Sequence, residues 1–229
     1  MFLNPYRFGA GSTLNALILA QGPVNYWRNG EASGSVWVDD VAADGTYFGS
    51  VSLGNAALYP GPGALTTVGN FSNTTFAQST AVPGSMTAMT LLSIIRPTNL
   101  TEVKLVGVQR DENTTRKWQW RSNGTAMEFI NLVTPTLVAS ATGVLAINTT
   151  YFVGFEVDAS GNYSMYVNGV AIKTGTLPAA NYGGAGDAYR LGYATGPAVS
   201  QSGTTCENAV FNKVLGPTVH AELFAATGL

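Results

Sequence analysis

From Met86 onward, short runs of alternating apolar and polar residues are separated by turn residues about every ten positions. This spacing is typical of antiparallel β-sandwiches. In the clearest run, residues 151–158, the apolar side chains fall on one face of the expected strand: Tyr151, Val153, Phe155 and Val157. Gly154 and Glu156 fall on the other face. Because side chains alternate along a strand, the apolar row is predicted to point into a core.

A tight hairpin is predicted after this strand. The next expected strand covers residues 163–167 and ends at Asn168-Gly169. Both turn residues tolerate positive φ, which the two central positions of a type I′ turn require. Val167 and Val170 should therefore flank the turn.

Further strands are expected along the same stretch, and none is long enough to suggest a parallel α/β sheet. They cover residues 88–96, 102–109, 117–122, 127–133, 189–194 and 207–211. Only the end of the chain has a helical pattern, with Pro217 at the first helical position, Gly216 before it and Gly228 at the stop. The apolar stripe of this helix is Val219, Leu223 and Phe224. The pattern predicts an all-β sandwich with a short C-terminal helix.

Composition and charge narrow the class of protein. The chain has 229 residues, which suits one large domain, and only 10% of them are charged while 45% are hydrophobic. The net charge is −2 without any basic block, which argues against nucleic-acid binding. The longest apolar stretch, residues 14–20, is far shorter than the ~20 residues of a membrane-spanning helix. Cys206 is the only cysteine, so no intrachain disulfide forms.

Several segments resemble one family in its own order. Residues 14–34 read LNALILAQGPVNYWRNGEASG, which resembles the opening of laminin-G-like, concanavalin-A-like jelly-roll domains, especially those of bacterial and bacteriophage proteins. Four further pieces follow: the turn of residues 40–47, the Tyr-x-Asn-Gly hairpin of residues 163–169, the strand of residues 190–193, and the final strand and helix of residues 206–228. The resemblance implies a two-sheet antiparallel jelly-roll sandwich.

The resemblance also divides the chain. Residues 14–229 are expected to form the laminin-G-like jelly-roll domain, and residues 1–13 to form an N-terminal arm outside it. The arm is apolar and aromatic, with Phe2, Leu3, Tyr6 and Phe8. Because so short a segment cannot form a core of its own, we expect these side chains to pack on a partner.

The sequence departs from the family at Asn29, where Leu is usual, and at Cys206, where Asp is usual. Residues 41–43 are Val-Ala-Ala in place of the family's Gly-Asn-Gly. A calcium site would use the hard oxygen ligands of Asp39, Asp40 and Asp44, but Val and Ala side chains supply none of the further ligands that Ca²⁺ requires. Turn and cap roles are favoured for the three aspartates, and no metal or other cofactor is expected. Whether one of them holds calcium stays open.

Two arrangements typical of enzymes are incomplete. Glucanases of this fold use a Glu-x-Asp-x-x-Glu strand, whose carboxylates act as nucleophile and acid/base. The nearest match begins at Glu156 and Asp158, but its third acidic position is Gly161. His220, the only histidine, lies on the predicted helix, where a surface or packing role is favoured over catalysis. The chain is therefore expected not to be an enzyme.

A weak glycan site is a further candidate. Tyr182 and Tyr189 flank a glycine-rich loop that ends in Asp187. Aromatic rings stack on sugar faces and a carboxylate accepts hydroxyl hydrogens, so these three residues are the predicted ligand-binding set, with a plain loop as the alternative. Trp118 and Trp120 share one strand face, and their burial in the core is favoured over an exposed stacking surface. The charged residues 110–117 are interpreted as a solvated hairpin tip.

Three classes of function fit such a domain: a bacteriophage virion structural protein, a carbohydrate-binding adhesin or lectin, and a glycan-cleaving enzyme. A secreted lectin needs an export signal, and residues 1–20 are not expected to be one, because Pro5, Gly9, Gly11 and Asn15 interrupt the apolar run. We therefore expect a virion protein, assembled in the host cytoplasm as a capsid decoration or tail-associated component. Its expected partners are other virion proteins, in repeated copies or as a homo-oligomer, with a glycan as a further partner and neither nucleic acid nor membrane.

Overall fold

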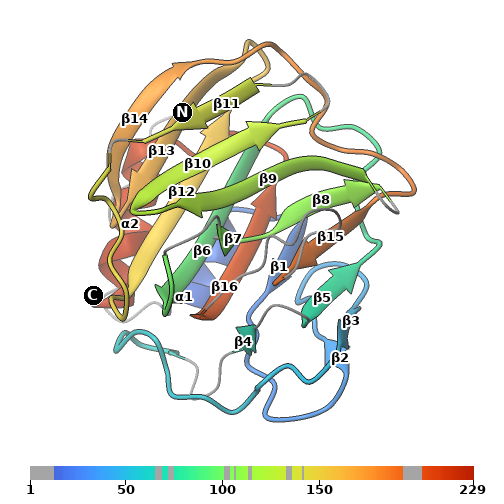
Figure 1. Cartoon of the computed structure of the whole chain (residues 1–229), viewed down its shortest axis with the longest axis vertical. Coiled ribbons are helices and arrows are strands. Elements are labelled where there is room, and N and C mark those ends of the chain that lie inside the picture. Colours follow the sequence, from blue (N-terminus) through green and yellow to red (C-terminus); the bar gives the residue numbers. More distant parts are fainter. Residues whose placement is uncertain are drawn as a thin grey trace.

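The computed structural model describes residues 13–64, 69–71, 75–100, 104–105, 107–112, 115–132, 136–140, 142–192 and 203–229. Within these residues the chain folds into two stacked antiparallel sheets (Figure 1). Two helices, α1 (Leu14–Ala20) and α2 (Pro217–Thr227), cover the outer side of one sheet. The predicted all-β sandwich with a short C-terminal helix is confirmed.

The sheet beneath the helices, sheet A, has seven strands in the described part of the chain. In spatial order its strands are β1 (Asn25–Trp27), β16 (Gly203–Phe211), β6 (Met89–Pro97), β12 (Tyr151–Val157), β13 (Asn162–Val167) and β14 (Val170–Thr176), with β4 (Gly69–Phe71) also pairing with β16. The N-terminal strand β1 thus lies beside the C-terminal strand β16.

The opposite sheet, sheet B, has nine strands over the same described residues. In spatial order they are β11 (Thr136–Ala139), β10 (Ala126–Asn131), β9 (Thr115–Asn123), β8 (Gln109–Glu112), β15 (Ala188–Leu191), β5 (Phe76–Ser79), β3 (Gly45–Phe48) and β2 (Val36–Trp37), with β7 (Lys104–Leu105) pairing with β9. Strand β2 forms one edge of this sheet.

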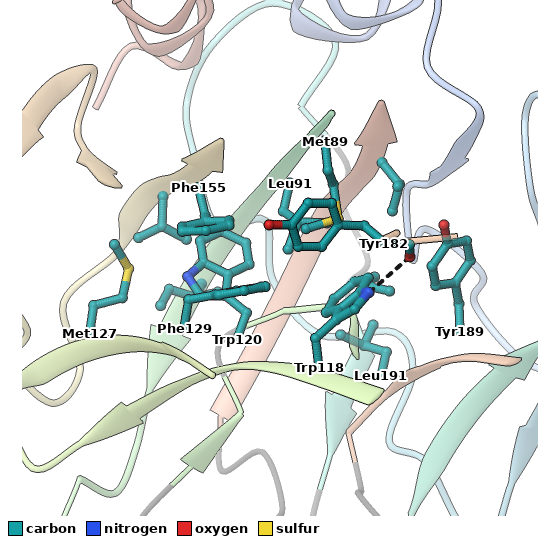
Figure 2. Packing of buried hydrophobic residues seen from close by; sticks show 14 of the residues in the cluster. Met89, Leu91, Trp118, Trp120, Met127, Phe129, Phe155, Tyr182, Tyr189 and Leu191 are labelled. Carbon is teal, nitrogen blue, oxygen red and sulfur yellow. Dashed lines mark hydrogen bonds between the residues drawn. The ribbon is translucent and has the colours of Figure 1, made fainter. Parts of the chain in front are cut away.

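The main core lies between the two sheets and is rich in aromatic rings (Figure 2). Phe155 of β12 stacks on Phe129 of β10, with ring centroids 4.0 Å apart. Trp118 and Trp120 of β9 are both buried in this core, as the sequence predicted. The Trp118 indole Nε1 donates to the carbonyl oxygen of Tyr182 at 3.0 Å.

Strand β12 is buried on both faces. Val153, Phe155 and Val157 point into the main core, which confirms the predicted apolar row. Phe152 and Glu156, on the other face, are buried as well, because helices α1 and α2 lie over sheet A and form a second core with it. The sequence pattern did not predict this second layer.

The predicted hairpin is present between β13 and β14. Asn168 and Gly169 both have positive φ, 50° and 76°, and Val167 pairs with Val170 across the turn. The local sequence alone determines this geometry, because few residues other than Asn and Gly adopt positive φ at low cost.

Helix α2 begins at Pro217 and is followed by Gly228, as predicted. Helix α1 was not predicted, since only the end of the chain was expected to be helical. The Thr13 hydroxyl accepts the Ala16 amide at 3.2 Å and caps this helix, while Leu14, Leu17 and Ile18 are buried. A helix of about two turns is too short for its apolar periodicity to be distinctive.

The strand expected over residues 102–109 is wrong as a continuous element, because β7 ends at Leu105 and β8 begins at Gln109. The arm side chains Phe2, Leu3, Tyr6 and Phe8 lie outside the described residues, so the arm stays a prediction.

In the part of the chain that the structure describes, neither helix is long and apolar enough to span a membrane.

Candidate ligand-binding site

The predicted stacking residues lie inside the molecule. Tyr182 is 1% exposed and Tyr189 is 0% exposed. Tyr189 packs edge-on against Trp27, with ring centroids 5.7 Å apart. Tyr182 packs edge-on against Phe129, with ring centroids 6.4 Å apart. Both tyrosines lie among the buried residues drawn in Figure 2. Because neither ring offers a face to solvent, the two tyrosines do not form the predicted sugar-stacking surface. Aromatic residues beside a glycine-rich loop look alike in sequence whether they point outward or inward.

The third predicted ligand residue, Asp187, is committed to a buried ion pair. Its carboxylate accepts a hydrogen bond from Arg110 Nε. The Nη1 of Arg110 donates to the Asn181 carbonyl oxygen at 3.2 Å. A Cβ on Gly184 would lie 2.4 Å from both charged groups, so this glycine lets the loop fold closely around the pair. Arg110 is therefore buried, and the prediction that it belongs to a solvated hairpin tip is wrong.

Glu156 and His220 meet beneath helix α2. The Glu156 carboxylate accepts hydrogen bonds from the Tyr166 hydroxyl at 2.6 Å and the Gly216 amide at 3.0 Å, and His220 Nε2 lies 3.3 Å away. Burial raises the pKa of Glu156, but these hydrogen bonds outweigh burial and hold the pKa below its ordinary value. His220 is buried and stacks on Tyr166, with ring centroids 3.8 Å apart. The packing role predicted for His220 is confirmed and the surface alternative is wrong.

The predicted turn role of the aspartates is present. One Asp39 carboxylate oxygen accepts the backbone amides of Tyr26, Val41 and Ala42 at 2.9–3.0 Å, and the other accepts Asn25 Nδ2 at 2.8 Å. Asp44 accepts the Asp39 amide at 2.9 Å. Asp39 and Asp44 therefore fix the path of the chain as it leaves β2, while Asp40 remains at the surface.

An open hollow of about 210 Å³ lies beside this turn. It is lined by Arg28, Gly30, Glu31, Val38 and Asp40, and we name it the Arg28 pocket. The lining residues come from the segment after β1 and from the segment after β2, so both sheets contribute to it. The pocket is smaller than the ~300–1,000 Å³ of sites for drug-sized ligands, which suits a single small ring or one end of a longer ligand.

Arg28 is held by a buried carboxylate from the other end of the chain. Its Nη2 lies 3.1 Å from Glu207 Oε1 and donates to the Gly63 carbonyl oxygen at 2.9 Å. The hydroxyl of Tyr59 donates to Glu207 at 2.7 Å, and the hydroxyl of Tyr26 also donates to it. Glu207 is therefore fully hydrogen-bonded although it is buried.

The protonation states in this cluster are well defined. Burial and the Glu207 carboxylate raise the pKa of both Tyr26 and Tyr59 far above its ordinary value, so both phenols stay protonated donors. Burial lowers the pKa of Arg28, but Glu207 outweighs burial and raises it, so the guanidinium stays charged. The cluster therefore presents one fixed cationic donor group to the pocket.

The backbone around Arg28 is locked in an unusual conformation. Glu207 has a φ of +53° and lies in a β-bulge, where the register between β16 and β6 shifts after Cys206. Asn29 has a φ of +57°. Its Oδ1 accepts a hydrogen bond from Trp37 Nε1 at 2.6 Å, and its Nδ2 donates to the Thr205 carbonyl oxygen at 3.3 Å. Bulges and positive φ at residues other than glycine concentrate at functional sites. Asn29 directly follows Arg28 in the chain, and Glu207 contacts its guanidinium.

The pocket combines one donor group with two acceptor groups. Among the described residues Arg28 Nη1 makes no hydrogen bond, so it is available to a ligand. The Glu31 carboxylate accepts the Val38 amide and the Tyr47 hydroxyl, both at 2.8 Å, and each of its oxygens keeps a further lone pair. Asp40 accepts only Asn15 Nδ2, at 3.3 Å, from the described part of the chain. Such a set suits hydroxyl groups, which both donate and accept.

Sequence reasoning missed this site. The residues that form it are Arg28, Glu31 and Asp40, with Glu207 beneath them. Two signals were present in the sequence, because the departures from the family at Asn29 and Cys206 directly adjoin Arg28 and Glu207. Nothing in the sequence indicated that these two departures meet in space.

The fold is shared with solved structures. Domain 4 of AbnA, an extracellular GH43 arabinanase from Geobacillus stearothermophilus in complex with arabinotriose, matches with a TM-score of 0.62 and 15% identity, over 88% of this chain and 97% of that domain. The binding domain of botulinum neurotoxin DC, in complex with rat synaptotagmin II, matches with a TM-score of 0.66 and 14% identity, over 90% of this chain and 52% of the neurotoxin chain. A Trypanosoma rangeli sialidase matches with a TM-score of 0.58 and 12% identity, over 89% of this chain and 32% of the sialidase chain.

These likenesses confirm the predicted jelly-roll fold. The chain spans nearly the whole arabinanase domain, about half of the neurotoxin chain and about a third of the sialidase chain. No family model matches the chain, and no curated protein matches it in sequence.

Proposed function

We propose that the chain is a non-catalytic binding module that recognises a neutral glycan at the Arg28 pocket. The observation that carries the proposal is the charge arrangement. The positive charge of Arg28 is balanced by Glu207 beneath it, whereas Glu31 and Asp40 have no ion-pair partner among the described residues. The two carboxylates repel an anionic ligand and accept hydrogen bonds from hydroxyl groups, while Arg28 Nη1 donates to a ring or hydroxyl oxygen.

The known structures support this class of ligand. The arabinanase domain that the chain matches over almost its entire length was solved with arabinotriose, a neutral oligosaccharide. The neurotoxin domains are described as binding domains, and one is in complex with rat synaptotagmin II. The Arg28 pocket favours the first kind of ligand, because its polar groups lie in a small hollow rather than on a flat contact surface.

We propose that the module lacks catalytic activity. Retaining hydrolysis needs two carboxylates facing one cleft. Glu156 is buried beneath α2, and Asp158 accepts the amides of Ser160 and Asn162 at 2.8 Å in an exposed turn. Glu31 and Asp40 line an open hollow, but each already accepts a hydrogen bond from an N–H donor, an arrangement that suits a hydrogen-bond acceptor rather than a general acid.

Calorimetric titration with a small panel of saccharides tests the proposal. The panel contains arabinotriose, maltotriose and cellotriose as neutral ligands and sialyllactose as an anionic one. We expect at least one neutral trisaccharide to bind and sialyllactose to bind at least tenfold more weakly than that one. Absence of binding by every neutral saccharide at millimolar concentration contradicts the proposal.

The matched variants are Asp40→Asn in the pocket and Glu222→Gln on the exposed side of α2. Both replace an exposed carboxylate by an amide. A hydrogen bond to a charged group contributes roughly 1.5–3 kcal/mol, so Asp40→Asn is expected to lower affinity about tenfold or more. Glu222→Gln lies outside the pocket lining and should leave affinity unchanged. Equal affinities of the two variants would place the ligand elsewhere.

Carriage of this module on a bacteriophage particle is a separate proposal. It rests on the family resemblance and on the apolar arm of residues 1–13, and the described residues do not bear on it. Mass spectrometry of purified particles tests it, and repeated absence of the chain from them would exclude a virion role.

A further inference from the structure

Phe48 and Phe76 form a stacked aromatic pair on the outer face of sheet B. They lie opposite each other on β3 and β5, with ring centroids 4.6 Å apart and ring planes 14° apart. Their neighbours Tyr47 and Ala77 are buried in the core, so the two phenylalanines point to the other side of the sheet. Phe48 is 40% exposed.

Arg190 extends this pair into a column of three planar groups. Its guanidinium carbon lies 5.2 Å from the Phe76 ring centroid, and its Nε donates to Gln78 Oε1 at 2.9 Å. Because β5 lies between β15 and β3, Arg190 and Phe48 approach Phe76 from opposite sides. The column holds Phe76 in place, and Phe76 in turn supports one face of Phe48.

Phe48 is next to the edge strand β2. Val36 of β2 pairs with Thr46, two residues before Phe48 on β3. Val36 and Phe48 are 51% and 40% exposed. Among the described residues Phe48 makes its ring contact with Phe76, so the exposed surface of the Phe48 ring is available to a ligand.

The Phe48 ring and the Arg28 pocket belong to one continuous surface. Val38 lines the pocket, and Val36 lies two residues before it on the same outward row, 51% exposed. Val38 lies two residues after Val36, and Phe48 lies two residues after Thr46, the antiparallel partner of Val36, so Val38 and Phe48 are offset in opposite directions from this pair. The offset amounts to four strand positions, about 14 Å at ~3.4 Å per residue. One sugar ring cannot span this distance, whereas a short oligosaccharide can.

We propose that this surface is a second subsite, in which Phe48 stacks on a sugar ring of a linear neutral oligosaccharide whose end occupies the Arg28 pocket. The inference deepens the proposed function and rests on it. It assigns the ligand a minimum length, because a single sugar in the pocket does not reach Phe48. It also assigns a role to Val36, whose apolar side chain lies beneath the connecting part of the ligand.

The test compares two substitutions on the outer face of sheet B, Phe48→Ala and Leu137→Ala. Leu137 is 50% exposed and lies on β11, at the opposite edge of the sheet from β2. The probes are the neutral trisaccharide of the panel that binds wild type most tightly and its own monosaccharide, measured by calorimetry and by ligand-observed NMR. Circular dichroism checks that both variants fold.

Phe48→Ala is expected to weaken trisaccharide binding about tenfold and to leave monosaccharide binding unchanged, while Leu137→Ala changes neither. Phe48→Trp, which keeps a flat ring, should retain trisaccharide affinity. Equal trisaccharide affinity of wild type and Phe48→Ala overturns the subsite while the pocket proposal stands. Failure of wild type to bind either probe overturns both proposals, and loss of monosaccharide binding in Phe48→Ala overturns the separation into two subsites.

Discussion

Arg28 and Glu207 are 179 residues apart in the sequence, and in the structure Arg28 Nη2 lies 3.1 Å from Glu207 Oε1. Glu207 is buried, while the Arg28 side chain keeps 24% of its surface exposed. This asymmetry gives the pair two roles. The carboxylate links the last strand, β16, to β1 and to Arg28, which follows β1. The guanidinium places a positive charge at the surface of the pocket.

Removal of the Glu207 carboxylate should therefore destabilise the fold. Glu207→Ala leaves the hydroxyls of Tyr26 and Tyr59 without their acceptor and Arg28 without its counter-ion. We expect a loss of about 3–5 kcal/mol in the free energy of unfolding, measured by urea denaturation. Glu222→Ala, on the exposed side of α2, should change it by less than about 0.5 kcal/mol. Similar values for both variants would show that the buried cluster does not stabilise the protein.

The main core offers a second test of stability. Phe155 is fully buried and stacks on Phe129 across the two sheets. Phe155→Ala is expected to cost about 3–5 kcal/mol, because it removes a large ring from a position that cannot collapse freely. Ile147→Ala, at an exposed loop position, serves as the control. A loss below about 1 kcal/mol for Phe155→Ala would contradict the assigned face of β12.

The parts of the fold that the sequence predicted depend on local chemistry. Asn168-Gly169 determines its hairpin because the turn needs two positive φ angles, and Pro217 with Gly228 delimits its helix by the same kind of local rule. The Arg28 pocket depends instead on a residue pair from opposite ends of the chain and on a bulge at Glu207. Pattern reasoning along one strand cannot locate such a contact.

The failure at Tyr182 and Tyr189 has a related cause. Two tyrosines beside a glycine-rich loop and an aspartate are residue types that suit a sugar site. The direction of each side chain, however, depends on strand register, which the loop sequence leaves open. Leu191 and Tyr189 lie on the inward row of β15, and Arg190 lies on the outward row. An exposed aromatic ring is found instead at Phe48, on a strand that the sequence did not predict.

Close packing of α2 on sheet A predicts an effect at a glycine. A Cβ on Gly154 would lie 2.5 Å from His220 Cε1, so Gly154→Ala forces the imidazole away from Glu156. We expect a loss of about 1–3 kcal/mol, the usual range for overpacking. Gly84→Ala is the control, since its Cβ would meet only Ala185 at 3.9 Å. Thermal unfolding of both variants checks the prediction, and an unchanged melting temperature for Gly154→Ala would contradict it.

The depressed pKa of Glu156 predicts a dependence of stability on pH. Since the pKa is lower in the folded protein than its ordinary value of 4.5, Glu156 stabilises the fold above that pH, and the contribution is lost as pH falls. Wild type should therefore lose more stability than Glu156→Gln between about pH 5 and about pH 3. Asp158, whose pKa its bond with Asn162 also lowers, is present in both proteins and cancels in the comparison. Parallel pH profiles would contradict the prediction.

Chelation of metal ions should leave the fold unchanged. The two Asp39 oxygens already accept four hydrogen bonds, three from backbone amides and one from Asn25, so a cation at this turn would have to displace N–H donors that point at the same lone pairs. Asp44 is likewise committed to the Asp39 amide. Because Ca²⁺ takes six to eight oxygen ligands, the remaining groups of the turn do not suffice for it. We expect the melting temperature in excess EDTA to equal that in excess calcium chloride to within about 1 °C, whereas a ligand present at 100 times its Kd would contribute ~2.7 kcal/mol and raise it by several degrees. A calcium-dependent rise that Asp39→Asn abolishes would show that the turn binds the ion after all.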